Sequence, residues 1–264
     1  VLFSGGTGAE GDGGVGRWSE FFEQQNEGGK RLASICHTRP SGAFFGLAQL
    51  SPFTRNSKAW KDLMALPSIE DRVNALRNET TRAKLIAEGI EAGDMKNLAH
   101  MLHPFGIDSK PNLDFARQQS LLQLAEAEGK DPVEVYVERL LASEGREFFN
   151  FWMFGGNLDN QWKYMQLPHV VPMLGDAGAH VGFFTDTDSP TVLLSELTRE
   201  QGVYSLPEAV HRITGKSAAI IGLKERGELR EGWHADINVI DYENLSTCHP
   251  CLLYTSPSPR DTLL

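Results

Sequence analysis

The first 36 residues place a helical pattern between two short apolar runs, and no other feature limits the fold of this chain so strongly. Residues 1–6 and 32–36 have the composition of strands, and residues 17–28 carry aromatic side chains at helical spacing before two glycines. A strand, a helix and a second strand in so short a stretch form one βαβ unit, whose strands run parallel. The sequence therefore predicts an α/β fold built on a parallel sheet.

A third apolar run, residues 169–174, leads directly into Asp176 and a series of small residues. The run predicts a buried strand, and Gly175 and Gly178 predict a sharp turn at its end. Barrels of the α/β class place catalytic groups at the C-terminal ends of such strands, where apolar surroundings perturb the pKa of a carboxylate. The pattern alone leaves two interpretations of Asp176 open: it acts as a general acid/base, or it caps the next helix.

A long excursion, residues 43–166, separates the second apolar strand from the third and is rich in helical patterns. Helices are predicted to begin at Ser68 and at Asp131, where Pro132 suits the first turn. An insertion of this size between barrel strands often forms a lid or a substrate pocket. We interpret the aromatic cluster at 148–154 as core or as the lining of a pocket for an acyl group.

Residues 227–241, GELREGWHADINVID, carry spaced glycines, an Ala-Asp pair and a final Asp after an alternating apolar run. They resemble the closing signature of the metal-dependent amidohydrolases. Further segments are similar to one branch of that superfamily, the D-aminoacylases or N-acyl-D-amino-acid deacylases: residues 176–180, 189–191, 205–210 and 213–215. The resemblance is strongest over residues 168–245 and continues more weakly upstream.

This resemblance implies the C-terminal part of a TIM-like (β/α) barrel over residues 1–225, interrupted by the helical insertion at about 43–166. It implies part of a small β-sandwich over residues 226–246, where residues 235–240 alternate as a strand does. The last residues, 247–264, have Ser-Pro repeats and no periodicity, so we expect an artefactual or disordered tail.

The resemblance also implies a chemistry. In that family a bound zinc lowers the pKa of a water molecule, and the Asp at the end of the last barrel strand transfers the proton. Asp176 matches this position, as general acid/base and as a candidate metal ligand. The family's His-x-His pair has no counterpart, since no two histidines of this chain are separated by one residue. We therefore expect the other metal ligands to lie outside the chain, and the chain by itself to be inactive.

Arg39 and His180 are the candidate substrate-binding residues. A guanidinium just after the second strand suits the carboxylate of an N-acyl amino acid, because the two groups form parallel hydrogen bonds. The alternative for Arg39 is a surface ion pair. His180 follows Asp176 by four positions, and it either binds the substrate, orients Asp176 or is an ordinary loop histidine.

Two other groups of side chains have spacings that invite a metal interpretation. Cys36 and His37 end the same strand, but they point to opposite faces, so we expect Cys36 in the core and His37 in the wall of the pocket. His100 and His103 have i, i+3 spacing, but no acidic residue nearby completes a metal site. We therefore favour loop or helix-end positions for both histidines.

Composition excludes several kinds of partner. The formal net charge is −10 and no long basic run occurs, which argues against nucleic-acid binding. No apolar run approaches the roughly 20 residues that span a bilayer, so no membrane partner is expected. Cys36, Cys248 and Cys251 make no disulfide framework, which favours a reduced, cytoplasmic protein.

The sequence thus predicts a hydrolase that cleaves the C–N bond of a linear amide, with a small-molecule N-acyl-D-amino acid as the substrate. The first alternative is a cyclic-amide hydrolase similar to hydantoinases, because a change from linear to cyclic amides leaves Asp176 unaltered. The second is a non-catalytic homologue that kept the barrel and lost the metal. A His-x-His motif in upstream sequence would exclude this second alternative.

Overall fold

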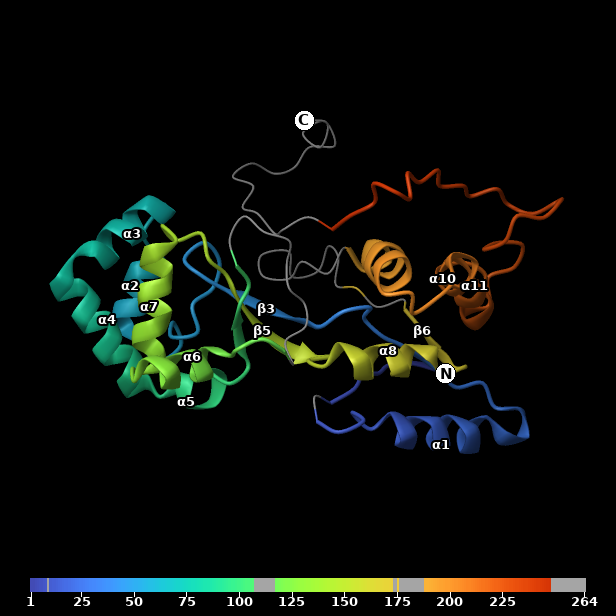
Figure 1. Cartoon of the computed structure of the whole chain (residues 1–264), viewed down its shortest axis with the longest axis horizontal. Coiled ribbons are helices and arrows are strands. Elements are labelled where there is room, and N and C mark those ends of the chain that lie inside the picture. Colours follow the sequence, from blue (N-terminus) through green and yellow to red (C-terminus); the bar gives the residue numbers. More distant parts are fainter. Residues whose placement is uncertain (9, 107–116, 173–174, 176–187, 248–264) are drawn as a thin grey trace.

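The structure of the chain is a computed structural model that describes residues 1–8, 10–106, 117–172, 175 and 188–247. Two sheets and a set of helices make up this part of the chain. A cluster of helices lies at one end of the long axis, and the parallel strands lie toward the other end (Figure 1). The predicted mixed α/β class is confirmed.

Short strands form the parallel sheet: β1 (Leu2–Ser4), β2 (Ala33–Ile35) and β6 (Val170–Val171). The central strand is β2, and both neighbours pair with it in parallel. Helix α1 (Val15–Asn26) and the 3₁₀ turn η1 (Glu27–Gly29) connect β1 to β2. The predicted βαβ unit and the third, buried strand are therefore confirmed. The strands of the described residues do not close into a barrel, so the barrel stays a prediction.

Helices α1 and α8 (Leu158–Gln166) pack against each other beside this sheet. Phe22 of α1 and Tyr164 of α8 are buried in one apolar cluster with Val170 of β6. The ring centroids of Trp18 and Tyr164 lie 5.7 Å apart. Aromatic burial of this kind contributes several kcal/mol, which explains why the aromatic spacing of residues 17–28 produces a helix on the sheet.

The excursion between β2 and β6 contains a second sheet that the sequence did not predict. Strands β3 (Ser41–Phe45), β5 (Phe149–Phe154) and β4 (Leu102–Pro104) pair antiparallel in that order. Strands β3 and β5 run side by side from the parallel sheet to the helical cluster (Figure 1). The aromatic cluster at 148–154 is mostly the central strand of this sheet. An aromatic run this short lacks the periodicity that distinguishes a strand from a buried helix.

The helices of the excursion that precede α8 form the cluster at its far end: α2 (Lys58–Met64), α3 (Ile69–Arg77), α4 (Glu79–Ala92), α5 (Asp94–Leu98), α6 (Leu121–Glu128) and α7 (Pro132–Ala142). The predicted starts are confirmed. The Ser68 hydroxyl accepts a hydrogen bond from the Asp71 backbone N–H. Asp131 caps α7 in a capping box with Glu134, and Pro132 occupies the first turn.

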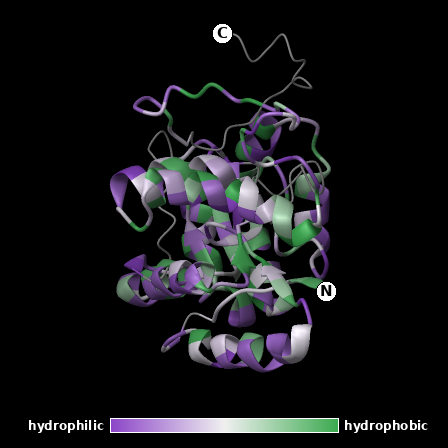
Figure 2. Cartoon of the chain, turned by 90° about the vertical axis from the view of Figure 1, so that its right-hand side faces the viewer, coloured by the Kyte–Doolittle hydropathy of each residue, from purple (hydrophilic) through white to green (hydrophobic). Residues whose placement is uncertain are grey.

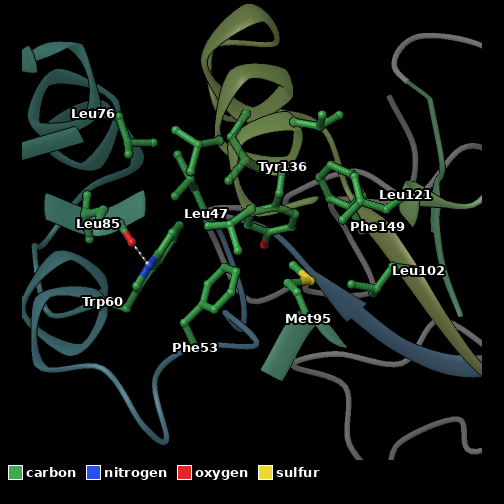
Figure 3. Close-up of a cluster of buried hydrophobic side chains, with 14 of the residues drawn as sticks. Leu47, Phe53, Trp60, Leu76, Leu85, Met95, Leu102, Leu121, Tyr136 and Phe149 are labelled. Carbon is green, nitrogen blue, oxygen red and sulfur yellow. Dashed lines mark hydrogen bonds between the residues drawn. The ribbon is translucent and has the colours of Figure 1, made fainter. Parts of the chain in front are cut away.

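A large apolar core fills the space between these helices and one face of the antiparallel sheet (Figure 3). Trp60 is fully buried in this core, and its indole N–H donates to the Leu85 carbonyl at 2.9 Å. Its ring lies 4.6 Å from that of Phe53 and 6.1 Å from that of Tyr136, measured between centroids. The excursion therefore has a hydrophobic core of its own.

From Asp188 to Thr247 the chain is helical at first and then lacks helices and strands. The helices of this segment are α9 (Ser189–Val192), the π-helical η4 (Leu193–Glu200), α10 (Leu206–Ile213) and α11 (Gly215–Ile221). None of the helices in the described residues is long and apolar enough to cross a membrane.

The strand predicted at residues 235–240 does not form, so this prediction was wrong. Residues 222–247 contain no strand, and apolar side chains such as Leu229 and Val239 are exposed there. Figure 2 shows apolar stretches on this outlying segment. An alternating pattern becomes a strand only when its backbone pairs with a neighbour, and no described strand lies beside it. The predicted tail at 247–264 falls outside the described residues except for Thr247.

Candidate active site

The C-terminal ends of the three parallel strands meet at one edge of the sheet, because β1, β2 and β6 run in the same direction. Residues that follow β1 and β2 line this edge, and the segment that contains Asp176 follows β6. Asp176 and His180 themselves lie outside the described residues. Val170 and Val171 are fully buried, so the strand that leads toward Asp176 has the environment predicted for it.

The end of β1 approaches its neighbours so closely that only glycine fits at position 5. A Cβ on Gly5 would overlap the hydroxyls of Tyr164 and Ser34, which are hydrogen-bonded to each other at 2.8 Å. Burial raises the pKa of Tyr164 to about 12, so its hydroxyl stays a donor. A metal-binding side chain therefore has no room at this position.

We expect Gly5→Ala to lower the free energy of unfolding by about 1–3 kcal/mol, the usual cost of overpacking a buried site. Gly6→Ala is the matched control, because no atom of the described residues lies within 4 Å of a Cβ at that position. The control should be neutral or stabilise by up to about 1 kcal/mol. Urea unfolding followed by circular dichroism measures both values, and equal stabilities of the two variants would contradict the close approach at Gly5.

The side chain of Gln161, from α8, joins the segments that follow β1 and β2. The Thr7 hydroxyl donates to Gln161 Oε1 at 3.2 Å, and Gln161 Nε2 donates to the backbone carbonyl of His37 at 2.6 Å. Gln161 is 2% exposed, so water does not compete for these bonds. His37 is also buried at this edge, whereas Cys36 lies in the core as expected. Burial raises the pKa of the Cys36 thiol, which makes it unreactive.

Arg39 is buried at the same edge and makes an ion pair. Its Nε donates to Asp188 Oδ1 at 2.8 Å, and its Nη1 donates to the Pro40 carbonyl at 3.0 Å. Arg39 is 4% exposed and Asp188 is 27% exposed, so the pair is only partly in contact with solvent. Next to it, Thr38 Oγ1 lies 2.9 Å from Ser189 Oγ and donates to the Ser189 carbonyl. The chain thus returns to the end of β2 at Asp188 and Ser189.

A family model described as the amidohydrolase family matches residues 43–256. The chain belongs to the amidohydrolase family. A stretch of 56 residues is 46% identical to the N-acyl-D-aspartate deacylase of Alcaligenes xylosoxydans xylosoxydans, and it covers 21% of this chain and 11% of that protein. The predicted resemblance to the amidohydrolases and to their D-aminoacylase branch is confirmed.

Solved amidohydrolase structures are also similar to the chain. D-aminoacylase is 17% identical, with 85% of this chain and 36% of that chain covered and a TM-score of 0.41. The N-acyl-D-glutamate deacylase of Bordetella bronchiseptica is 16% identical, with 89% and 38% covered and a TM-score of 0.43. The chain thus spans about a tenth of the length of the curated relative and just over a third of these two solved chains.

The described residues of this amidohydrolase do not form a metal site by themselves. No three His, Cys, Asp or Glu side chains in that part of the chain lie close enough together to hold an ion. His103 lies in β4 rather than in a loop or at a helix end, and His100 lies exposed in a turn. Burial lowers the pKa of His103 to about 4, so this histidine is neutral at pH 7. No reaction step through a metal follows from these residues.

Several polar residues of the edge were missed from the sequence: Thr7, Gln161, Asp188 and Ser189. Gln161 and Asp188 act through partners more than 120 positions away, and no local pattern marks such a contact. Lys216 of α11 was missed as well. Its Nζ donates to the Val170 carbonyl at 3.1 Å, and burial, followed by the charge of Arg212, lowers its pKa to about 8.

Proposed function

We propose that the complete protein is a hydrolase that cleaves the C–N bond of a linear amide, with an N-acyl-D-amino acid as its substrate and Asp176 as its general acid/base. One observation carries the proposal: the strand that leads toward Asp176 is buried and pairs in parallel with β2. Its C-terminal end therefore lies at the edge where α/β enzymes place their catalytic groups. The segment that is 46% identical to an N-acyl-D-aspartate deacylase supports this substrate class.

In the proposed reaction, Asp176 moves a proton from the attacking water to the leaving nitrogen. The oxygen of a water molecule adds to the amide carbonyl carbon while the Asp176 carboxylate takes a proton from that water. The C–N bond then breaks as Asp176 returns the proton to the leaving nitrogen. These steps give a carboxylic acid and an amine, and the acid then loses its proton as the amine gains one. The products are thus a carboxylate and a D-amino acid with a charged ammonium group, and Asp176 is again ionised. Zinc stays a prediction for the complete protein, as does a cytoplasmic location, which rests on the cysteine content.

The proposed role of Arg39 and His180 is to bind the substrate. Arg39 has five N–H donors on its guanidinium, and the ion pair with Asp188 uses Nε. A guanidinium suits the carboxylate of an N-acyl amino acid, because the two groups form parallel hydrogen bonds. His180 would contact the substrate next to Asp176.

The function is tested by measuring the release of free amino acid by the complete protein. N-acetyl-D-amino acids, their L-enantiomers and a cyclic hydantoin are supplied in parallel. Hydrolysis of the D-compounds alone supports the proposal. Preferential hydrolysis of the hydantoin would establish the cyclic-amide alternative, and no hydrolysis of any compound would support a non-catalytic homologue.

We expect Arg39→Lys to raise KM for the N-acyl-D-amino acid about tenfold to a hundredfold, because one charged hydrogen bond of about 1.5–3 kcal/mol is lost. The turnover number should change less, since the carboxylate lies away from the bond that breaks. Asp188→Asn is the control, because it removes the charge of the ion-pair partner and keeps the guanidinium. An equal rise of KM in both variants would show that Arg39 acts through Asp188 and not on the substrate.

A further inference from the structure

One side chain that belongs to neither strand joins the segments that follow β1 and β2. Gln161 uses both halves of its amide: the carbonyl oxygen accepts from Thr7 and the nitrogen donates to the His37 carbonyl. Thr7 is 9% exposed and His37 is 6% exposed, so both bonds are formed away from bulk water. Buried hydrogen bonds of this kind hold their partners in one arrangement, because water does not replace a broken bond.

The neighbouring residue of α8 holds the glycine-rich loop that follows β1. Asn160 is 2% exposed, and its Nδ2 donates to the carbonyls of Gly8 at 3.4 Å and Gly11 at 3.1 Å. Glycine gives this loop little stiffness of its own. The start of α8 is fixed in turn, since Asn157 caps the helix through the Asn160 backbone N–H. Helix α8 therefore provides a rigid support for the end of β1.

Only glutamine combines the required length with the required donor and acceptor. Glutamate keeps the acceptor for Thr7 but loses the N–H that binds the His37 carbonyl. Leucine keeps a similar volume and loses both bonds. The two substitutions therefore separate the hydrogen bonds from the packing of the side chain.

We propose that Gln161 is a positioning residue of the active site, which holds the segments after β1 and β2 at the separation that hydrolysis requires. The proposal rests on the proposed function, because that function places the reaction at this edge of the sheet. Gln161 acts through Thr7 and His37 and takes no part in the proton transfer.

The experiment compares Gln161→Leu and Gln161→Glu in the complete protein with Gln166→Leu, which removes an exposed glutamine from the same helix. Hydrolysis of an N-acetyl-D-amino acid gives the turnover number and KM, and hydrogen exchange reports the backbone amides of residues 5–8 and 37–38. We expect both Gln161 variants to lose about tenfold to a hundredfold in turnover number, because small displacements at a reacting site have effects of that size. KM should stay within about twofold, and exchange at both segments should accelerate.

A double mutant tests whether Thr7 and Gln161 act through the hydrogen bond between them or independently of each other. Thr7→Val removes one bond, and Thr7→Val combined with Gln161→Leu should be no slower than Gln161→Leu alone. A turnover number of Gln161→Leu equal to that of Gln166→Leu, or unchanged exchange at both segments, would overturn the proposal. Failure of the unmutated protein to hydrolyse any amide would instead overturn the proposed function, and the exchange data would still report whether Gln161 holds the two segments.

Discussion

Asp176→Asn is expected to lower the turnover of an N-acyl-D-amino acid by the complete protein about 10²–10⁴-fold, the usual contribution of general acid/base catalysis. The amide of Asn has nearly the shape of the carboxylate but takes no proton from water. The free energy of unfolding should change little, because the substitution preserves volume. Amino-acid release and urea unfolding, measured on the same preparation, separate the two effects.

Asp159→Asn is the matched control, because it removes a carboxylate that is 54% exposed on α8 and pairs with Arg117. The control should keep full activity. Retention of more than about a tenth of the activity by Asp176→Asn, well above the range expected for an acid/base, would identify Asp176 as a structural residue. The proposed mechanism would then be wrong, although the family assignment would stand.

Trp60→Ala is expected to lower the free energy of unfolding by about 3–5 kcal/mol, the range measured when a large aromatic side chain is removed from a core. Trp60 is fully buried, and the variant also leaves the Leu85 carbonyl without its indole donor. Contacts with Phe53 and Tyr136 are lost at the same time. Since whole domains are stable by only about 5–15 kcal/mol, the helical cluster should unfold at much lower urea concentrations.

Lys61→Ala provides the comparison, because Lys61 is the next residue of α2 and is exposed. Its free energy of unfolding should stay within about 0.5 kcal/mol of the unmutated value. The parallel sheet lies outside this apolar cluster, so hydrogen exchange at β1 and β2 should respond less to Trp60→Ala than exchange at α2 and α4. Equal effects on both regions would show that the two cores unfold as one unit.

Local patterns were sufficient for elements whose signals lie within a few residues. The βαβ unit follows from aromatic spacing between two apolar runs, and the helix starts at Ser68 and Asp131 follow from their capping side chains. The buried strand before Asp176 follows from an apolar run of strand length. These signals are local because the hydrogen bonds and the side-chain period of a helix span three or four residues, and the side-chain period of a strand is two.

The functional predictions came more from the resemblance to family motifs than from the pattern of apolar residues. Asp176 was singled out by its place after a buried apolar run, and its role came from the resemblance to a family. His180 was singled out by its spacing from Asp176. Both remain predictions because they lie outside the described residues. Arg39 was predicted from its place after β2. An ion pair was considered for Arg39 only as a surface alternative without a named partner, and its pair with Asp188 is only partly in contact with solvent.

The sequence by itself determined the parallel unit, the helix starts at Ser68 and Asp131, and the family. Only the tertiary structure decided the antiparallel sheet β3-β5-β4, the unpaired segment at 235–240 and the bridge made by Gln161. Each of these depends on whether residues far apart in the chain become neighbours: β3 pairs with β5 across about a hundred residues, and Gln161 reaches His37 across 124. Such pairing is determined by the packing of whole elements, which a local pattern does not record.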